Sequence, residues 1–281
     1  MDVALESRID DRFVTVGELK IRYIEQGSGP AAILLHGASL GSCADVWRRN
    51  LGPLADYGIR AIAYDQPGFG LSDDPAEWHV GFRTSFILRF MNALGLQRAC
   101  LVGHSQAGAM AVSLALSHPE HVSRVVVLGT GSLLPPLEGQ PRTAPGAAEG
   151  DRQAEPTIDE TRAELEANVY DRTLIADTDV AIRHRMSTGK NFRAFLARNR
   201  AGEKTPGGGS AVPLWQRLVE VTQPLMLIYG REDRAQAGAR AKVLAQRFPS
   251  LDLHILDNCK HLVQWDAAEA FHRLAGPFLR G

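Results

Sequence analysis

The stretch Cys100–Leu116, CLVGHSQAGAMAVSLAL, predicts a buried strand, a sharp turn and a buried helix in direct succession. Ser105 lies at the turn, with Gly103 two residues before it and Ala107 two residues after it. A serine in a strained strand-to-helix turn presents its hydroxyl clear of the sheet, and its neighbours must be small because strand and helix pass close to them. The stretch therefore has the arrangement called a nucleophile elbow, with the pattern G-x-S-x-A-G in place of the commoner G-x-S-x-G.

The length and charge of the chain limit the classes of protein to which it can belong. It has 281 residues and a formal net charge of −1. That length suits one large α/β domain with an insertion. A near-neutral charge gives no basis for binding nucleic acid or an anionic membrane surface. The expected partner is therefore a small-molecule substrate, and a homodimer is left open.

The N-terminus and the cysteines indicate the compartment. Residues 1–8 lack the apolar core of a signal peptide, and no run of the sequence is apolar for long enough to span a membrane. Cys43, Cys100 and Cys259 are odd in number, far apart and without C-x-x-C spacing. This pattern argues against a metal site or a disulfide framework. We expect buried thiols, a cytoplasmic location and no cofactor.

Apolar runs and helical spacings alternate along most of the chain. Alternating residues around Gly17 predict a hairpin over 12–25. Further strands are expected at 31–35, 60–64, 100–102, 125–128, 225–229 and 253–255, and helices at 46–55 and 82–94. Strands that alternate with helices are typical of an α/β protein with a largely parallel sheet.

The composition changes after residue 133. Residues 135–156 are rich in Pro, Gly, Ala and Glu, which is typical of a loop. Residues 158–200 have helical composition and many arginines, which is typical of a solvated helix face, and 205–210 reads TPGGGS, a flexible connector. The sequence therefore predicts a core formed by 1–133 and 213–281, interrupted by a helical cap at 134–212.

Three residues of a catalytic type follow three different predicted strands. Ser105 follows one strand, Asp233 follows the strand at 225–229, and His261 follows the last strand. Because the carboxyl ends of parallel strands meet at one edge of a sheet, these side chains are expected to lie together. Their order along the chain, Ser, Asp and then His, is the order of an α/β-hydrolase triad. Of the nine histidines, only His261 has this placement.

Two other polar residues at strand ends are interpreted as structural. His36 opens a loop of small residues that can bring backbone N–H groups to a developing negative charge. We expect its side chain to pack and to hydrogen-bond this loop. Asp65 precedes the nucleophile in the chain and is expected to order its own turn.

The chain resembles the meta-cleavage product hydrolases, which are carbon–carbon bond hydrolases of aromatic degradation within the α/β-hydrolase superfamily. The resemblance covers the predicted core on both sides of the cap. The stretches that carry it are Trp47–Leu54 (WRRNLGPL), Asp65–Asp73 (DQPGFGLSD) and Cys259–Asp266 (CKHLVQWD). It implies an α/β-hydrolase fold, with a mostly parallel, doubly wound eight-stranded sheet and an inserted helical cap.

The resemblance also implies roles for individual residues. Ser105 would be the nucleophile, His261 the general base and acid, and Asp233 the carboxylate that orients the histidine. The backbone N–H groups of Ala38 and Gln106 would form the oxyanion hole.

Substrate binding would come from the cap and from the loops around the triad. A cap arginine of the family binds the substrate carboxylate, and Arg183 is the best positional match, with Arg185 close behind. A guanidinium suits this role because it offers a planar bidentate fork. Two residues apart on a helix, the two side chains project about 200° apart, so at most one can face Ser105. Further contacts are expected from Ser39, His104, Leu262 and Trp265.

Several positions depart from the family pattern. The family usually has Gly-Pro-Gly-Ala in the loop where this chain has Ala38–Ser42. It often has Trp where Leu262 follows the histidine and Asn where His104 precedes the nucleophile, and a loop Asn corresponds roughly to Asp45. These departures leave the triad intact and change residues near the substrate.

Three functions are compatible with these residues. The first is a serine hydrolase that attacks the 6-oxo carbonyl of a ketonised 2-hydroxy-6-oxohexa-2,4-dienoate. The second is a carboxylesterase for a small, acidic ester that Arg183 would hold. The third is a ligand receptor on the same fold, against which the lack of a partner-binding tail argues. Dehalogenases and epoxide hydrolases of this fold need Asp at the position of Ser105 and are excluded.

Overall fold

An eight-stranded sheet forms the centre of the molecule, with strand order β1-β2-β4-β3-β5-β6-β7-β8. The structure is a computed structural model that describes residues 9–138, 152–204 and 212–281. Its strands are β1 Arg12–Val16, β2 Leu19–Gln26, β3 Ala31–Leu35, β4 Arg60–Tyr64, β5 Ala99–His104, β6 Val122–Leu128, β7 Leu225–Gly230 and β8 Asp252–Leu256. The β1–β2 hairpin is antiparallel and pairs antiparallel with β4, whereas all later pairs are parallel. The predicted mostly parallel sheet is thus confirmed.

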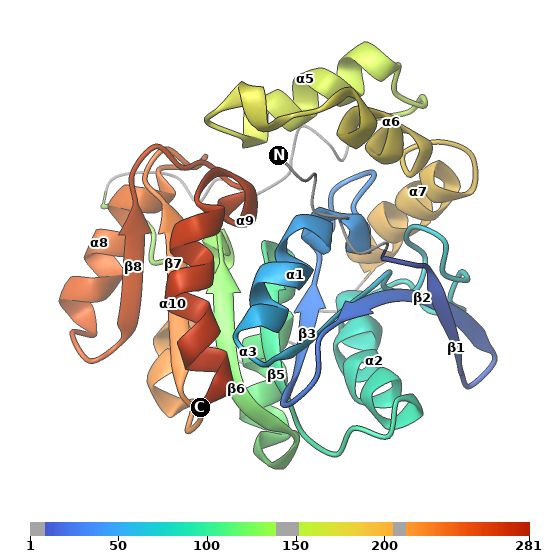
Figure 1. The fold of residues 1–281 in the computed structure, drawn as a ribbon. Coiled ribbons are helices and arrows are strands. Elements are labelled where there is room, and N and C mark those ends of the chain that lie inside the picture. The colour runs from blue at the N-terminus through green and yellow to red at the C-terminus, as the bar shows by residue number, and fades with distance from the viewer. Residues whose placement is uncertain (1–8, 139–151, 205–211) are drawn as a thin grey trace, which may run out of the picture.

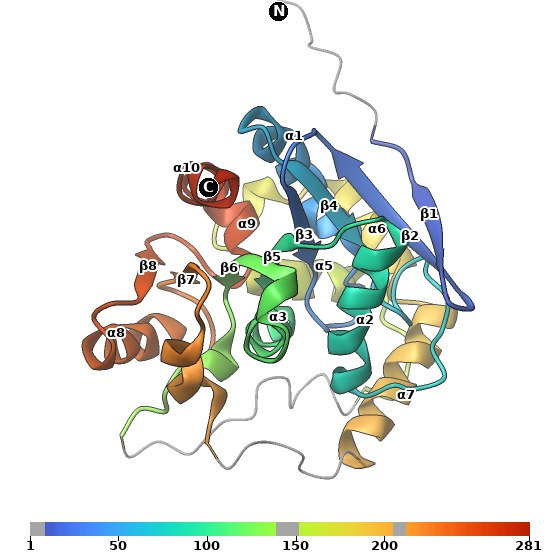
Figure 2. The same cartoon turned by 90° about the horizontal axis from the view of Figure 1, so that it is seen from below.

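Helices cover both faces of this sheet (Figure 1, Figure 2). They are α1 Arg48–Asp56, α2 Val80–Ala93, α3 Gln106–Ser117, α8 Ala237–Arg247, α9 Val263–Asp266 and α10 Ala268–Arg280. Figure 2 shows α2, α3 and α8 on one face and α1 with α10 on the other. The expected helix at 46–55 begins as a 3-10 turn, Ala44–Trp47, before α1 starts.

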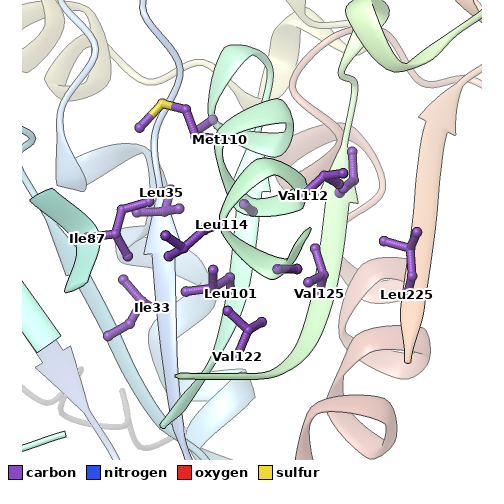
Figure 3. Packing of buried hydrophobic residues seen from close by; sticks show 14 of the residues in the cluster. Ile33, Leu35, Ile87, Leu101, Met110, Val112, Leu114, Val122, Val125 and Leu225 are labelled. Atoms are coloured by element: carbon purple, nitrogen blue, oxygen red, sulfur yellow. The ribbon is translucent and has the colours of Figure 1, made fainter. Parts of the chain in front are cut away.

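Each face of the sheet has its own hydrophobic core, because successive side chains of a strand point to opposite faces. On β3, Ile33 and Leu35 pack in the core that contains α2 and α3, and Leu34 packs in the core under α1 and α10. Figure 3 shows the first of these cores, where Leu101 of β5 lies beside Leu114 of α3. Both faces are buried, so the central strands are continuous apolar runs.

Three further helices lie above the carboxyl edge of the strands (Figure 1). They are α5 Ile158–Asn168, α6 Asp177–Arg185 and α7 Lys190–Lys204. A capping box starts α5, in which Thr157 accepts from the Glu160 backbone and the Glu160 side chain accepts from the Thr157 backbone. Most of the loop expected at 135–156 and the connector expected at 205–210 lie outside the described residues.

The arginines of α6 and α7 are not all solvated, which corrects one expectation. Arg185, Arg193 and Arg200 are exposed. Arg198 instead stacks on the ring of Phe69, with its guanidinium carbon 3.6 Å from the ring centre, and donates to the Gly68 carbonyl at 2.6 Å. This contact fastens α7 to the turn that follows β4.

The remaining observations concern cysteines and membrane spans. Cys43, Cys100 and Cys259 are buried free thiols. In the part of the chain that the structure describes, no helix is both long enough and apolar enough to cross a membrane.

Candidate active site

The turn between β5 and α3 holds Ser105 in a strained conformation. Its backbone has φ 58° and ψ −128°, a region that non-glycine residues rarely adopt. Its N–H donates to the Leu128 carbonyl at 2.8 Å, and the Thr130 hydroxyl donates to its carbonyl at 2.6 Å. A Cβ on Gly103 would lie 2.5 Å from the Ala107 carbonyl oxygen. Glycine at 103 therefore permits the close approach of strand and helix that the elbow needs.

Asp233 and His261 meet in the loops after β7 and β8. The Nδ1 atom of His261 lies 3.1 Å from Oδ2 of Asp233, and both side chains are buried. Ser105 lies in the loop after β5, so all three residues stand at the carboxyl edge of the sheet. Such a pair can orient an imidazole as the base of a serine nucleophile.

The Arg234 guanidinium donates a hydrogen bond to the ring nitrogen of His261 that faces away from Asp233. Its Nη2 lies 2.9 Å from His261 Nε2. A guanidinium can only donate, so Nε2 accepts and Nδ1 carries the proton that His261 donates to Asp233. Between Ser105 and His261, both among the described residues, no hydrogen bond joins the hydroxyl to the imidazole. Before Nε2 can take a proton from Ser105, the Arg234 side chain must move away.

The loop after β3 packs against Ser105. A Cβ on Gly37 would lie 3.1 Å from the Cβ of Ser105, so the backbone of Gly37 and Ala38 passes directly beside the elbow. Gln106 is the first residue of α3, where backbone N–H groups lack an acceptor within the helix. The positive end of the helix dipole also favours negative charge at this point. Both expected donors of an oxyanion hole thus come from segments next to Ser105.

His36 and Asp65 have the structural roles expected of them. His36 Nε2 accepts from the Gln66 N–H at 3.0 Å, so its Nδ1 donates to the Gly37 carbonyl at 2.7 Å. Asp65 accepts from the backbone N–H groups of Ala44 and Leu71 and pairs with Arg22. Both residues order the loops on which the site is built.

Arg183 of α6 reaches the loop after β3. Its Nη2 donates to the Ser39 hydroxyl at 3.1 Å and to Oε1 of Glu164 at 2.6 Å. Arg185 is exposed. The helix geometry therefore turns Arg183 toward the core and Arg185 toward solvent.

Two adjoining cavities lie between α5, α6 and the sheet edge. The smaller, about 20 Å³, is lined by Gly37, His104 and His261 among others. The larger, about 750 Å³, has the size of a ligand pocket and is lined by residues of α1, α5 and α6. Residues common to both linings are Ser42, Val46, Leu165 and Arg183. Arg183 thus stands at the boundary between a ligand-sized space and the candidate triad.

Leu262 and Trp265 form part of the wall of this space. Leu262 lines the smaller cavity and donates its N–H to the Asn168 carbonyl at 3.0 Å. Trp265 lines the larger cavity, and its indole N–H donates to the Val46 carbonyl at 2.8 Å. The Arg49 guanidinium stacks 4.1 Å from the indole ring centre. These contacts join α5 and α1 to the loop that carries His261.

Comparison with known proteins places the chain in a family. A family model described as alpha/beta hydrolase fold matches residues 30–268. The chain is 32% identical to a 2-hydroxy-6-oxo-6-phenylhexa-2,4-dienoate hydrolase of Comamonas testosteroni, over 94% of this chain and 93% of that protein. The chain is an α/β hydrolase of the meta-cleavage product hydrolase family.

Other relatives agree with this assignment. The hydrolase is 33% identical to a 2-hydroxy-6-oxononadienedioate/2-hydroxy-6-oxononatrienedioate hydrolase of Burkholderia vietnamiensis strain G4, over 94% of this chain and 92% of that protein. A solved 2-hydroxy-6-oxo-6-phenylhexa-2,4-dienoate hydrolase from Rhodococcus sp. strain RHA1 superposes with a TM-score of 0.81 at 25% identity, covering 98% of this chain and 99% of that chain.

Some residues of the candidate site carry no clear signal in the sequence. Glu164, the ion-pair partner of Arg183, lies nineteen positions away on another helix. Arg234 directly follows Asp233 in the sequence. This adjacency to the expected partner of His261 is the signal that could have suggested its contact with His261. Across the described residues, no group of three or more His, Cys, Asp or Glu side chains is placed to hold a metal ion.

Two buried histidines lie at the carboxyl ends of β3 and β5, His36 directly after β3 and His104 as the last residue of β5. Burial lowers the pKa of His36 to about 3. Burial, together with the neighbouring His261, also holds the pKa of His104 well below its ordinary range. His104 Nε2 lies 2.9 Å from the His261 carbonyl oxygen. Both imidazoles are therefore neutral in the folded protein at neutral pH.

These two histidines make the stability depend on pH. Below about pH 6.5 the unfolded chain binds a proton at each of them and the folded protein does not, so stability falls as the pH falls. We expect each histidine to remove about 2 kcal/mol of unfolding free energy between pH 7 and pH 5. Urea unfolding at the two pH values measures the loss.

Matched histidine variants isolate this effect. His104→Asn should remove about half of the pH dependence that His36 and His104 contribute, because the side chain that titrates only in the unfolded state is gone. His118→Asn, a change at a partly exposed histidine, serves as the control. An unchanged slope in His104→Asn would contradict the assignment.

Proposed function

We propose that the hydrolase cleaves a carbon–carbon bond of 2-hydroxy-6-oxohexa-2,4-dienoates, with Ser105, His261 and Asp233 as its triad. The observation that carries this proposal is the position of Arg183. This guanidinium borders a ligand-sized cavity on one side and the cavity of His261 on the other. A substrate with a terminal carboxylate on Arg183 would extend its carbonyl toward Ser105. The names of the relatives, which are dienoate hydrolases, support the same substrate class.

The proposed chemistry uses the three residues in the roles of a serine triad, and it begins once the Arg234 side chain has left Nε2 of His261. In the ketonised substrate, the Ser105 oxygen adds to the 6-oxo carbonyl while His261 takes the hydroxyl proton. The N–H groups of Ala38 and Gln106 hold the resulting oxyanion. Its collapse breaks the C5–C6 bond, and the electron pair remains on the dienoate fragment, which takes the proton from His261. Water then hydrolyses the acyl group on Ser105, which releases a carboxylic acid.

We further propose that residues 134–212, which include α5 to α7, act as a cap over this site. The contacts of Arg183 with Ser39 and of Arg198 with Phe69 support this, because both join these helices to core loops. A cap excludes water and so strengthens the electrostatic interactions inside the site.

A direct comparison of substrates tests the proposal. Purified protein is offered a yellow ring-fission dienoate and a neutral nitrophenyl ester, and kcat/KM is measured for each. We expect the dienoate to be preferred by at least about tenfold, because it alone can use the carboxylate site. A preference for the ester would favour a carboxylesterase, which uses the same triad. Binding of the dienoate without turnover of either substrate would favour a receptor.

A further inference from the structure

A buried arginine without an ion pair lies behind the elbow. Arg83 is 5% exposed, and within the described residues no carboxylate pairs with it. Its position on α2 belongs to the apolar stripe that also contains Phe86, Ile87 and Phe90. Burial lowers the pKa of Arg83 to about 10, so it is still a cation at neutral pH. A buried charge without a counter-ion is costly, and the hydrogen bonds that hold it must offset that cost.

Two glutamines hold this guanidinium in place. Nη2 of Arg83 donates to Oε1 of Gln106 at 2.5 Å, and Nη1 donates to Oε1 of Gln66 at 3.1 Å. The Phe69 ring centre lies 5.4 Å from the guanidinium carbon. Arg83 is therefore bonded to the residue that directly follows the nucleophile.

The same network continues to the other wall of the site. Gln66 donates from its side chain to the His36 carbonyl at 2.6 Å and from its backbone to His36 Nε2 at 3.0 Å. His36 in turn donates to the Gly37 carbonyl. An unbroken chain of hydrogen bonds thus runs from Gln106 through Arg83 and Gln66 to the loop of Gly37. Its two ends are the two segments that supply the oxyanion-hole N–H groups.

We propose that Arg83 is a positioning residue for the oxyanion hole. It holds the Gln106 end and the Gly37 end of the hole at a constant separation, and it places a desolvated positive charge behind the donors. Donors that are already oriented need no reorganisation when charge develops on the carbonyl oxygen, so they stabilise the transition state more than the ground state. This inference rests on the proposed serine chemistry and is independent of which bond is broken.

Arg83→Met keeps an unbranched apolar side chain at this position and removes both hydrogen bonds and the charge. We expect kcat to fall by about 10- to 100-fold while KM changes little, which is less than the loss of a direct oxyanion-hole donor. The fall should be the same for a dienoate and for a nitrophenyl ester, because both pass through the same oxyanion. Arg83→Lys keeps the charge and should recover part of the rate. Arg89→Met, at an exposed arginine of the same helix, is the matched control.

Ligand binding separates positioning from a general structural role. Phenylboronic acid forms a negatively charged tetrahedral adduct on a serine oxygen, whereas benzamide binds as a neutral molecule without forming one. Arg83→Met should weaken the boronic acid by about 10- to 100-fold and leave benzamide within about twofold. If Arg83→Met does not fold, Gln106→Leu breaks the same link from the exposed end and should show the same selective loss.

The outcomes are distinct from those that test the substrate. Wild-type kcat in Arg83→Met, or equal weakening of boronic acid and benzamide, would overturn the role of Arg83. Absence of dienoate turnover in the wild-type protein would overturn the proposed function instead, and the ester would still report on Arg83.

Discussion

Ser105→Ala is expected to lower turnover by about 10⁴- to 10⁶-fold. Removal of the hydroxyl leaves no atom that can attack the substrate carbonyl, and the oxyanion hole and the binding contacts alone give only residual catalysis. The rate is measured under saturating dienoate and again with the nitrophenyl ester. Both should lose activity together, because the proposed mechanism begins with the same attack.

The fold should tolerate this substitution. Alanine can follow the same backbone path at φ 58° with a strain close to that of serine, and the bonds that anchor the turn come from the backbone of Ser105. The melting temperature should therefore change little. Ser113→Ala, further along α3, is the control and should keep full activity. Activity of Ser105→Ala within tenfold of the wild type, at an unchanged melting temperature, would refute the triad.

Arg183→Ala is expected to lower kcat/KM by about 30- to 1000-fold for a substrate that carries a carboxylate. The physical reason is the loss of a charge-assisted, partly desolvated ion pair, worth about 2–4 kcal/mol. The side chain of Arg183 is only 12% exposed, so solvent screens this pair weakly. A neutral nitrophenyl ester has no group to pair with Arg183 and should lose little.

Because Arg183 also pairs with Glu164, the effect of Arg183→Ala must be measured on both an acidic and a neutral substrate. Arg183 donates to this carboxylate at 2.6 Å, so Arg183→Ala also leaves Glu164 without this counter-charge. Any disturbance of α5 and α6 that results would affect both substrates equally. A loss confined to the acidic substrate therefore isolates the binding role.

Arg185→Ala completes the experiment as the matched control. Arg185 is exposed on the opposite side of α6, and its removal should change neither substrate by more than about twofold. Equal losses on both substrates in Arg183→Ala would assign Arg183 to the support of the cap. A selective loss in Arg185→Ala would place the carboxylate on the other face of the helix.

Short-range patterns in the sequence were sufficient to predict the architecture and the candidate triad. The apolar run before Ser105 became β5, and the small and apolar residues after it became α3. Asp233 and His261 could be selected because parallel strands direct their carboxyl ends to one edge, so a position in the chain implies a position in space. The opposite directions of the Arg183 and Arg185 side chains on α6 likewise follow from helix periodicity, because residues two positions apart lie on different faces of a helix.

Only the tertiary structure decided which side chains bond to one another. Arg234 on His261, Glu164 on Arg183, and the link from Gln106 through Arg83 all join residues from different elements. Periodicity says which face of an element a residue occupies, but it does not say which residue of another element lies opposite. That choice depends on how helices and loops pack in three dimensions, since a hydrogen bond forms only when donor and acceptor come within about 3 Å at a suitable angle. The sequence alone therefore determined the sheet, the elbow and the order of the triad, and packing determined the partners that surround them.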